Sequence, residues 1–410
     1  MPTNGQGQIS GPSSPPQPQT PPPGPASGTT SGTTSGTTSG TTSTASPSPI
    51  DETLKIFREW LRLENDIPVL AVLGTVAANM LPGDPVWLGL VAPPSSAKTE
   101  ILITLAKVPN VELVGTLTPA GLLSGTPRRQ HAPGARGGLL QKIGAFGFIV
   151  LKDFTSILSM RPESKGEILG ALREIYDGRW SRAVGADGGR ILSWSGKIGL
   201  LFGCTKVIDN QHTFIQQLGE RFLYCRLKPD PDQFLHATKH IGMKTKQMRK
   251  QLTEAVADLF AVPLRTPQEL TDKERYKIND DIKLAVRLRG AVDRDRYTRE
   301  LEDATGAEGT GRLGLTLERL LAGLDSLGIE RAAAFAVIEK VTFDSVPPNR
   351  LRVYEHLKEI DPSWADTSTI AHAIRLPTTT VRRALEDLVA YDLAEKQSVG
   401  QGNPTLWRVL

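Results

Sequence analysis

The segment from residue 86 to Thr99 constrains the fold of this chain more than any other. It opens with a short apolar run, residues 86–91, as expected for a strand buried on both faces. The run ends at Ala-Pro-Pro-Ser-Ser-Ala-Lys-Thr, residues 92–99, and a helix is predicted over residues 100–107. A strand, a loop, Lys-Thr and a helix in this order are typical of a phosphate-binding loop.

The chemistry of such a loop accounts for the residue types. Backbone N–H groups hold the phosphates, the lysine contacts the β- and γ-oxygens, and the threonine hydroxyl binds Mg²⁺. The full pattern has glycine where this chain has Ala92 and Ala97, and alanine is tolerated there if the local φ is negative. The alternative is a turn that only starts a helix, with Lys98 in solvent. The residues predicted to bind ATP and Mg²⁺ are Ala92, Pro93, Pro94, Ser95, Ser96, Ala97, Lys98 and Thr99.

Further apolar segments predict an α/β fold. Strand candidates recur at Val111–Val114, Phe146–Leu151 and residues 198–202, with helical segments between them, notably residues 165–176. This alternation predicts a mainly parallel sheet. After about Asp230 no strand is predicted, and residues 231–345 are expected to form a helical lid.

The first 50 residues have a different composition from the rest. They hold 11 of the 30 prolines, an SGTT array and none of the 92 charged residues, so a disordered tail is predicted. Two cysteines, Cys204 and Cys225, exclude a disulfide framework or a cysteine-based zinc site. No apolar stretch reaches 18 residues and no signal sequence is evident, so a cytoplasmic protein without a membrane partner is expected. The net charge of +4 permits nucleic-acid binding.

Other motifs follow the loop in a fixed order. They are Leu-Thr-Pro-Ala-Gly-Leu-Leu-Ser at 117–124, Phe-Ile-Val-Leu-Lys-Asp-Phe at 148–154 and Leu-Gly-Glu-Arg-Phe at 218–222. With them, the chain from about Asp51 to Val341 resembles AAA+ ATPases of the helix-2-insert group, which includes the minichromosome-maintenance helicases. Related ATPases with a C-terminal winged helix occur on phages and plasmids. Alanine also precedes the loop lysine in that group, as Ala97 does here.

The resemblance implies roles for four residues. Asp153 would be a metal-side carboxylate, the base that activates water, or neither, because Lys152 occupies the other acidic position of the motif. Thr205 would orient the attacking water. Arg221 would act as an arginine finger on the nucleotide of an adjacent subunit in a homo-oligomeric ring, or form an ordinary salt bridge. Arg312, with Arg319 as the alternative, would contact phosphate.

Two further segments are predicted to contact DNA through the resemblance. Residues 180–184 and 190–194 should form a hairpin that turns at residues 186–189 and faces the channel of the ring. Its basic residues are Arg179, Arg182, Arg190 and Lys197. The Gly/Arg-rich loop at residues 125–138 would be the helix-2 insert, and it is either a DNA or subunit contact or a surface loop. Its basic residues are Arg128, Arg129, His131 and Arg136.

Residues 346–410 predict a winged helix-turn-helix. Helices are expected at 347–360, 370–374 and 378–391, followed by a wing at 399–409. The third helix would face DNA with Thr378, Thr379, Thr380, Arg382 and Arg383. Residues 350–410 hold eight basic and eight acidic residues, so a protein-binding role is the alternative.

The expected domains are therefore a tail at 1–50, an AAA+ α/β domain at 51–230, a helical lid at 231–345 and a winged helix at 346–410. The expected function is an ATP-dependent DNA helicase or replication initiator of a mobile element. One alternative is a nucleotide-binding DNA regulator or scaffold that hydrolyses ATP weakly or not at all, as Lys152 suggests. Another is a transcription regulator that uses its AAA+ domain only to oligomerise.

Overall fold

The computed structural model describes residues 48–124, 137–185, 190–211, 215, 221–230, 232, 243–295, 297–298, 301–304, 306–398, 400 and 404–410. The chain from Pro47 to Leu410 forms one compact unit. Helix α1 (Pro49–Trp60) begins after its N-cap, Ser48, so the predicted end of the tail at residue 50 lies inside this helix. No helix in the described part of the chain has the length and hydropathy needed to span a bilayer.

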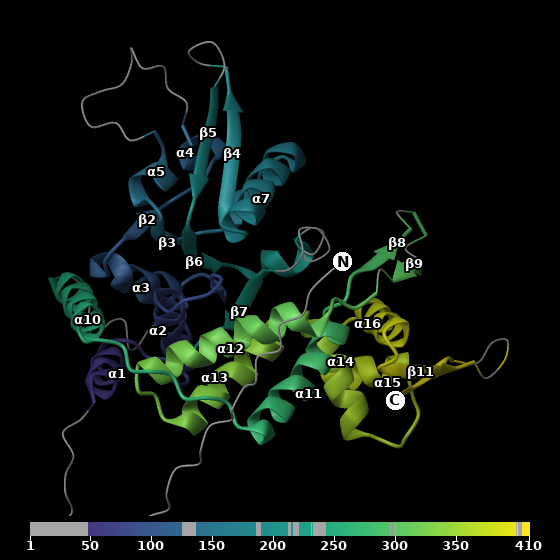
Figure 1. The fold of residues 1–410 in the computed structure, drawn as a ribbon. Helices are drawn as coiled ribbons and strands as arrows, with labels where there is room; N and C mark the ends of the chain where they lie inside the picture. The colour runs from purple at the N-terminus through teal and green to yellow at the C-terminus, as the bar shows by residue number, and fades with distance from the viewer. Residues whose placement is uncertain are drawn as a thin grey trace, which may run out of the picture. The chain divides into compact units, whose positions relative to one another are not determined.

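A five-stranded parallel sheet lies at the centre of the α/β part (Figure 1). Its strand order is β2-β3-β6-β1-β7, and each neighbouring pair runs parallel. The strands are β1 (Trp87–Val91), β2 (Val111–Val114), β3 (Phe146–Leu151), β6 (Lys197–Cys204) and β7 (Phe222–Arg226). The predicted parallel sheet is confirmed, and β7 is an additional strand that the sequence did not predict.

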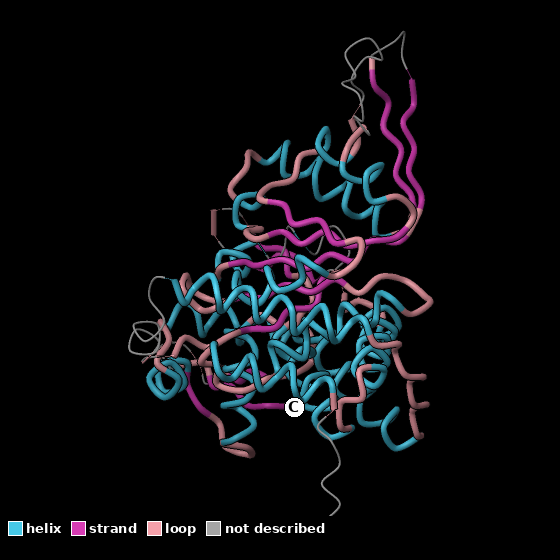
Figure 2. The backbone as a smooth tube through the Cα atoms, turned by 90° about the vertical axis from the view of Figure 1, so that its left-hand side faces the viewer, coloured by secondary structure: helices cyan, strands magenta, loops and turns pink. Residues whose placement is uncertain are grey.

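Apart from Lys197 at the start of β6, the central strands are apolar because helices cover both faces of the sheet (Figure 2). In β1, Leu88 and Leu90 face one core, which includes α2 (Ile67–Met80). The alternate residue Trp87 faces the other core, which includes α7 (Pro162–Tyr176). Side chains alternate between the faces of a strand, so only a run without polar residues can be buried on both sides.

The shorter elements of this part connect the strands. They are α3 (Lys98–Ile103), a 3₁₀ helix (Thr104–Lys107), α4 (Pro119–Leu122), α5 (Leu139–Ile143), α6 (Thr155–Leu158), the antiparallel hairpin of β4 (Arg179–Val184) and β5 (Arg190–Ser195), and a second 3₁₀ helix (Lys206–Gln211).

Four long helices follow the sheet: α10 (Met243–Ala261), α11 (Asp272–Leu288), α12 (Thr310–Ser326) and α13 (Arg331–Asp344). Helix α12 approaches α2 closely at a pair of glycines, since a Cβ at Gly323 would lie 2.2 Å from the backbone oxygen of Gly74. The C-terminal end of α13 covers β7, the outermost strand on one side of the sheet. Ser345 Oγ accepts the N–H of Tyr224 at 2.9 Å, and Asp344 Oδ2 accepts the N–H of Arg226 at 2.6 Å.

The prediction that residues 231–345 are helical throughout is wrong in one place. Between α11 and α12 the chain forms an antiparallel hairpin of β8 (Val292–Arg294) and β9 (Leu301–Ala304). The two strands have three and four residues and are rich in charge, so they lack the apolar alternation by which strands are usually recognised.

The C-terminal segment has three helices and a three-stranded antiparallel sheet. The helices are α14 (Pro348–Glu359), α15 (Thr367–Ile374) and α16 (Thr378–Ala390). The strands β10 (Ala365–Asp366), β11 (Ala394–Gln397) and β12 (Leu406–Val409) pair in the order β10-β12-β11. Asp366 caps α15 by accepting the N–H groups of Ser368 and Thr369. The predicted order of three helices and a hairpin is confirmed.

Candidate functional site

Lys98 lies inside the loop that follows β1. Its Nζ donates hydrogen bonds to the backbone oxygens of Ala92, at 2.7 Å, and Pro93, at 2.6 Å. The residue is only 9% exposed, and this burial lowers the pKa of its ammonium group from the ordinary value. The loop therefore wraps around a cation, and the alternative of a solvated Lys98 is wrong.

Two residues of this loop have left-handed backbone conformations. Ser95 has φ 62° and Ala97 has φ 60°, so Ala97 does not meet the condition of a negative φ under which alanine replaces glycine without strain. For a residue with a Cβ, this conformation costs about 1–2 kcal/mol. Ala92 meets no such strain, since it continues the strand by donating its N–H to Cys204 O at 3.1 Å. Strain of this kind persists where the surrounding structure enforces it, often at binding sites.

Ser96 is the second unusual side chain of the loop. Its hydroxyl is buried, and among the described residues it has no hydrogen-bond partner. A buried polar group without a partner costs about 1–3 kcal/mol, which a bound acceptor would recover. A phosphate oxygen is such an acceptor, and it would also replace the backbone oxygens that Lys98 now contacts. The donors in the loop thus fit a bound phosphate.

Polar side chains follow the neighbouring strands at the same edge of the sheet. Asp153, after β3, is exposed, and its Oδ1 accepts the N–H of Thr155 at 2.9 Å. Its negative charge raises the pKa of Lys98 against the larger effect of burial, so the carboxylate acts on the loop lysine from the same ends of the strands. The Thr155 hydroxyl lies 3.4 Å from that of Thr205, which follows β6, and accepts the N–H of Thr205 at 3.3 Å.

Thr155 was missed in the sequence. The signal that could have found it is a hydroxyl residue two positions after the acid that ends a buried strand. The structure brings together Lys98, Asp153 and Thr205, three of the predicted residues.

The possible ligands for a metal are few. Thr99 and Asp153 are exposed oxygen donors at this edge, whereas Lys152 is an exposed cation and cannot ligate a metal. Among the described residues, no group of three His, Cys, Asp or Glu side chains could hold a metal ion. Magnesium is usually held by one or two carboxylates together with phosphate oxygens and water. These donors therefore fit a magnesium ion that is shared with a nucleotide.

Arg221 lies at the amino ends of the strands, opposite the end that carries Lys98. It immediately precedes β7, whose first residue pairs with Trp87, the first residue of β1. Its Nη2 donates to both carboxylate oxygens of Asp177 at 3.0 Å, and its guanidinium lies 5.2 Å from the ring centroid of Tyr176. The side chain is only 8% exposed. The structure thus shows Arg221 in a salt bridge within the chain, the ordinary alternative to an arginine finger.

A cavity of about 580 Å³ beside this salt bridge holds three further cations. Arg319 pairs with Asp84 at 2.8 Å, and Arg312 is exposed. Lys197 donates to Leu81 O at 2.7 Å, and burial lowers its pKa to about 8. Arg312 and Lys197, predicted to contact phosphate and DNA respectively, therefore share one pocket at the edge of the sheet away from Lys98.

The hairpin of β4 and β5 presents few basic side chains. Arg179 is exposed, but Arg182 is half-buried and donates to Leu123 O at 3.1 Å. Arg182 lies on the face that also buries Trp180 and Trp194. The following residues lie outside the described residues or side chains: the turn 186–189, the side chain of Arg190, Leu218–Glu220, and Arg128, Arg129, His131 and Arg136.

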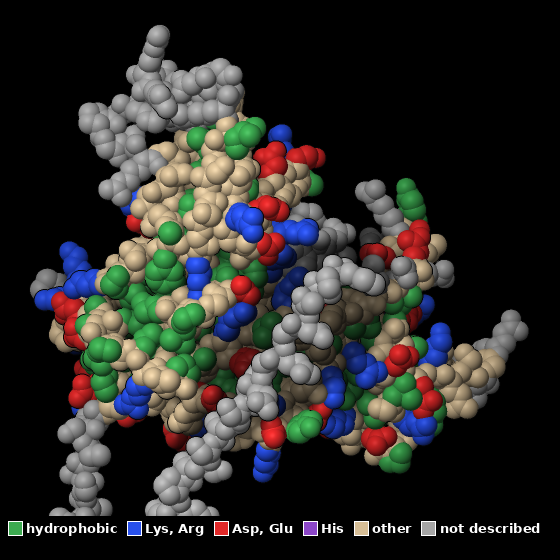
Figure 3. Space-filling view, viewed as in Figure 1, with side chains coloured by type: hydrophobic (Ala, Val, Ile, Leu, Met, Phe, Trp, Pro, Cys, Tyr) green, Lys and Arg blue, Asp and Glu red, His purple; other side chains and the backbone are tan. Residues whose placement is uncertain are grey.

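The predicted DNA-contacting residues of α16 lie along its outward side. Thr378, Thr379, Arg382 and Arg383 are exposed, and Thr380 is half-buried. Arg382 pairs with Glu386 one turn later, at 2.9 Å. Basic and acidic side chains are mixed over the C-terminal helices (Figure 3). A single-sign field therefore does not drive binding to this segment.

Comparison with known proteins adds no family to these observations. A scan against protein-family models gives no match, and a search of curated proteins gives none either.

Proposed function

We propose that this chain is an ATP-binding AAA+ protein that acts on DNA as a homo-oligomeric ring. The observation that carries the proposal is the loop after β1, where Lys98 is buried against backbone oxygens and the Ser96 hydroxyl has no partner among the residues that the structure describes. The phosphate oxygens of ATP are negatively charged and accept hydrogen bonds. They would therefore pair with the ammonium group of Lys98 and with the hydroxyl of Ser96.

The other residues at this edge have separate tasks. Thr99 and Asp153 would supply oxygen ligands to a magnesium ion bound with the nucleotide, and this ion would neutralise phosphate charge. Thr155 positions Thr205, which orients the attacking water. In the alternative to its role as a metal ligand, Asp153 accepts a proton from this water. Lys152, beside Asp153, contributes no carboxylate.

A second copy of the chain is needed to complete this site. Five residues of β1 pair with β7, so about 16 Å of strand separate the level of Arg221 from the start of the loop. Arg221 and Arg312 therefore cannot reach a nucleotide held by Lys98 of the same chain. An adjacent copy would bring them to the γ-phosphate, where arginine stabilises the developing charge.

DNA is the proposed partner of the ring, and the C-terminal segment is the proposed winged helix. The support is the topology of three helices and a three-stranded sheet, with the exposed Arg382 and Arg383 on α16. A second candidate function is a nucleotide-binding DNA regulator that does not hydrolyse ATP. It is favoured by the exposed Lys152 in the position of a magnesium-binding acid.

ATP turnover by the purified chain, with and without DNA, separates these functions. Lys98→Ala should weaken ATP binding at least 30-fold in calorimetry, as expected when a desolvated charge contact worth about 2–5 kcal/mol is lost. Lys107→Ala is the control, because Lys107 is an exposed lysine on the following helix. Unchanged affinity in Lys98→Ala would refute the phosphate-loop assignment, and tight binding without turnover would favour the regulator.

A further inference from the structure

A groove of about 540 Å³ lies between α16 and the β8–β9 hairpin. Its wall on α16 is formed by residues spaced three and four apart, and its other wall by the hairpin. The lining includes Thr379, Arg382, Arg383 and Glu386 from α16, and Thr298 and Leu301 from the hairpin. The opposite side of α16 is buried through Val381, Leu385 and Leu388. The outward face of this helix is therefore one side of a groove and not an open surface.

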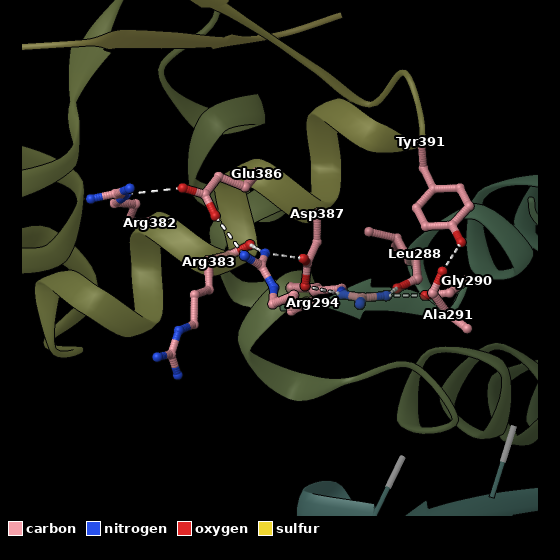
Figure 4. Close-up of polar contacts among 10 residues, drawn as sticks. Leu288, Gly290, Ala291, Arg294, Arg382, Arg383, Glu386, Asp387 and Tyr391 are labelled. Carbon is pink, nitrogen blue, oxygen red and sulfur yellow. Dashed lines mark hydrogen bonds and ion pairs between the residues drawn. The ribbon is translucent and has the colours of Figure 1, made fainter. Parts of the chain in front are cut away.

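The hairpin is fixed in this position by Arg294 of β8 (Figure 4). Its guanidinium donates to Glu386 at 2.7 Å, to Asp387 at 2.5 Å and to the backbone oxygen of Arg383 at 3.1 Å. The Arg294 side chain is 15% exposed, so these bonds are shielded from water.

A second arginine continues the network behind Arg294. Arg350 donates to Asp387 at 2.8 Å and to Gly290 O at 2.5 Å, which ties α14 and α16 to the chain just before β8. Both walls of the groove are thus held by the same carboxylate, Asp387.

The charge of the groove is positive. Glu386 is neutralised by Arg294 and Arg382, which both donate to it. Arg383 and Lys396 also line the groove, and in the described part of the chain their side chains have no ion-pair partner. Two cations are therefore free to bind an anion that enters.

The hairpin also offers apolar and aromatic side chains. Leu301 supplies apolar surface inside the groove. Tyr297, next to Thr298, is 89% exposed and offers a ring on which a base can stack.

We propose that this groove binds a single strand of DNA, with phosphates against Arg383 and Lys396 and a base stacked on Tyr297. A groove of this volume matches a small-ligand pocket. A helix that reads duplex DNA must instead enter a major groove about 12 Å wide, with its outward face open. The hairpin opposite α16 excludes that arrangement. This proposal rests on the proposed function for its choice of DNA as the partner. It differs in that the groove binds single-stranded DNA and not a duplex.

The test is fluorescence anisotropy on the full chain with a labelled oligo-dT and a mixed-sequence duplex of equal length, at several salt concentrations. The groove variant is Arg383→Glu with Lys396→Glu. The matched control is Lys358→Glu, at an exposed lysine of α14 that does not line the groove. Since each phosphate contact to a single strand contributes about 0.7 to the salt slope, loss of two should flatten it by about 1.4.

The groove variant should lose at least tenfold in affinity for oligo-dT and keep its affinity for the duplex, while Lys358→Glu behaves as the wild type. Tyr297→Ala should lose about fivefold or more on oligo-dT, as expected for removal of one stacked base. Wild-type affinity of the groove variant for oligo-dT would overturn the inference and leave the proposed function intact. Equal losses on both probes would overturn it in favour of duplex reading. If the wild-type chain binds neither probe, both the inference and the proposed role on DNA fail.

Discussion

The two edges of the parallel sheet differ in how their cations are satisfied. At the carboxyl ends of the strands, the hydrogen-bond acceptors of Lys98 among the described residues are neutral backbone oxygens of its own loop. At the amino ends, Arg221 and Arg319 are each paired with a carboxylate, Asp177 and Asp84. Lys98 is ready to receive an anion, whereas Arg221 and Arg319 must exchange an existing carboxylate partner to contact one.

This difference indicates what an assembly of copies would do. Binding of phosphate at the loop needs no broken ion pair. Engagement of Arg221 by a neighbour's nucleotide needs the loss of its contact with Asp177, so it should occur only when a copy docks. We therefore expect ATP binding to depend on the carboxyl ends of the strands, where Lys98 lies. ATP turnover should depend on both ends, because it also needs Arg221.

Loss of Arg221 is expected to have the largest effect. Arg221→Ala should leave ATP binding unchanged and lower turnover about 10³–10⁵-fold, the usual contribution of an arginine finger supplied in trans. Steady-state turnover and calorimetry measure the two quantities. Mixing this variant with Lys98→Ala should restore part of the activity, because hybrid interfaces combine an intact loop with an intact Arg221.

A matched variant separates this role from a structural one. Asp177→Asn weakens the same ion pair but keeps the arginine. Turnover in Asp177→Asn should stay within a few-fold of the wild type. If Asp177→Asn is as inactive as Arg221→Ala, the pair only holds the fold together and the arginine finger is rejected.

Asp153→Asn tests the carboxyl edge itself. The amide oxygen can still accept the N–H of Thr155, so the local turn should form. Turnover should fall about 10²–10⁴-fold, as expected for loss of a catalytic acid or base, with little change in ATP affinity. Asp258→Asn, at an exposed position of α10, is the control. Full activity of Asp153→Asn would exclude Asp153 from the chemistry.

Lys197, at the amino ends of the strands, should make the free energy of unfolding depend on pH. Burial lowers its pKa from 10.5 to about 8, so between these values the unfolded chain binds more protons than the folded chain. The contribution of Lys197 to the free energy of unfolding should therefore rise with pH from about 8 to 10.5, by on the order of 1 kcal/mol after solvent screening. In urea titrations, Lys197→Met should lack this rise and the exposed Lys206→Met should keep it. A rise that persists in Lys197→Met would assign it to another group.

The smallest predicted effect concerns the strained loop. Ala97 has φ 60°, where glycine has no steric penalty. Ala97→Gly should raise the free energy of unfolding by roughly 0.5–1 kcal/mol, the left-handed strain less the added entropy of glycine in the unfolded chain. Thermal melts measure it, with the unstrained Ala92→Gly as the control, which should destabilise.

The sequence predicted those parts of the fold whose cause is local. Phe146–Leu151 is a strand buried on both faces, and such a run is visible in one dimension. β8 was missed because Val-Asp-Arg is stabilised by contacts with α16, distant in the chain.

The site divides in the same way. The position of Lys98 follows from loop spacing, whereas the salt bridge of Arg221 joins residues 44 positions apart and depends on the folded sheet. No periodicity encodes that pairing.

The cover that α13 places on β7 limits how copies of this chain can associate. Ser345 and Asp344 accept the outward N–H groups of Tyr224 and Arg226, so these two donors of the outermost strand are already satisfied. An edge with free donors is a template for strand addition and for aggregation. Along β7, therefore, a neighbouring molecule cannot extend the sheet by a sixth strand, and contacts there must form between side chains. Such contacts can loosen and re-form without unravelling the backbone ladder of either partner.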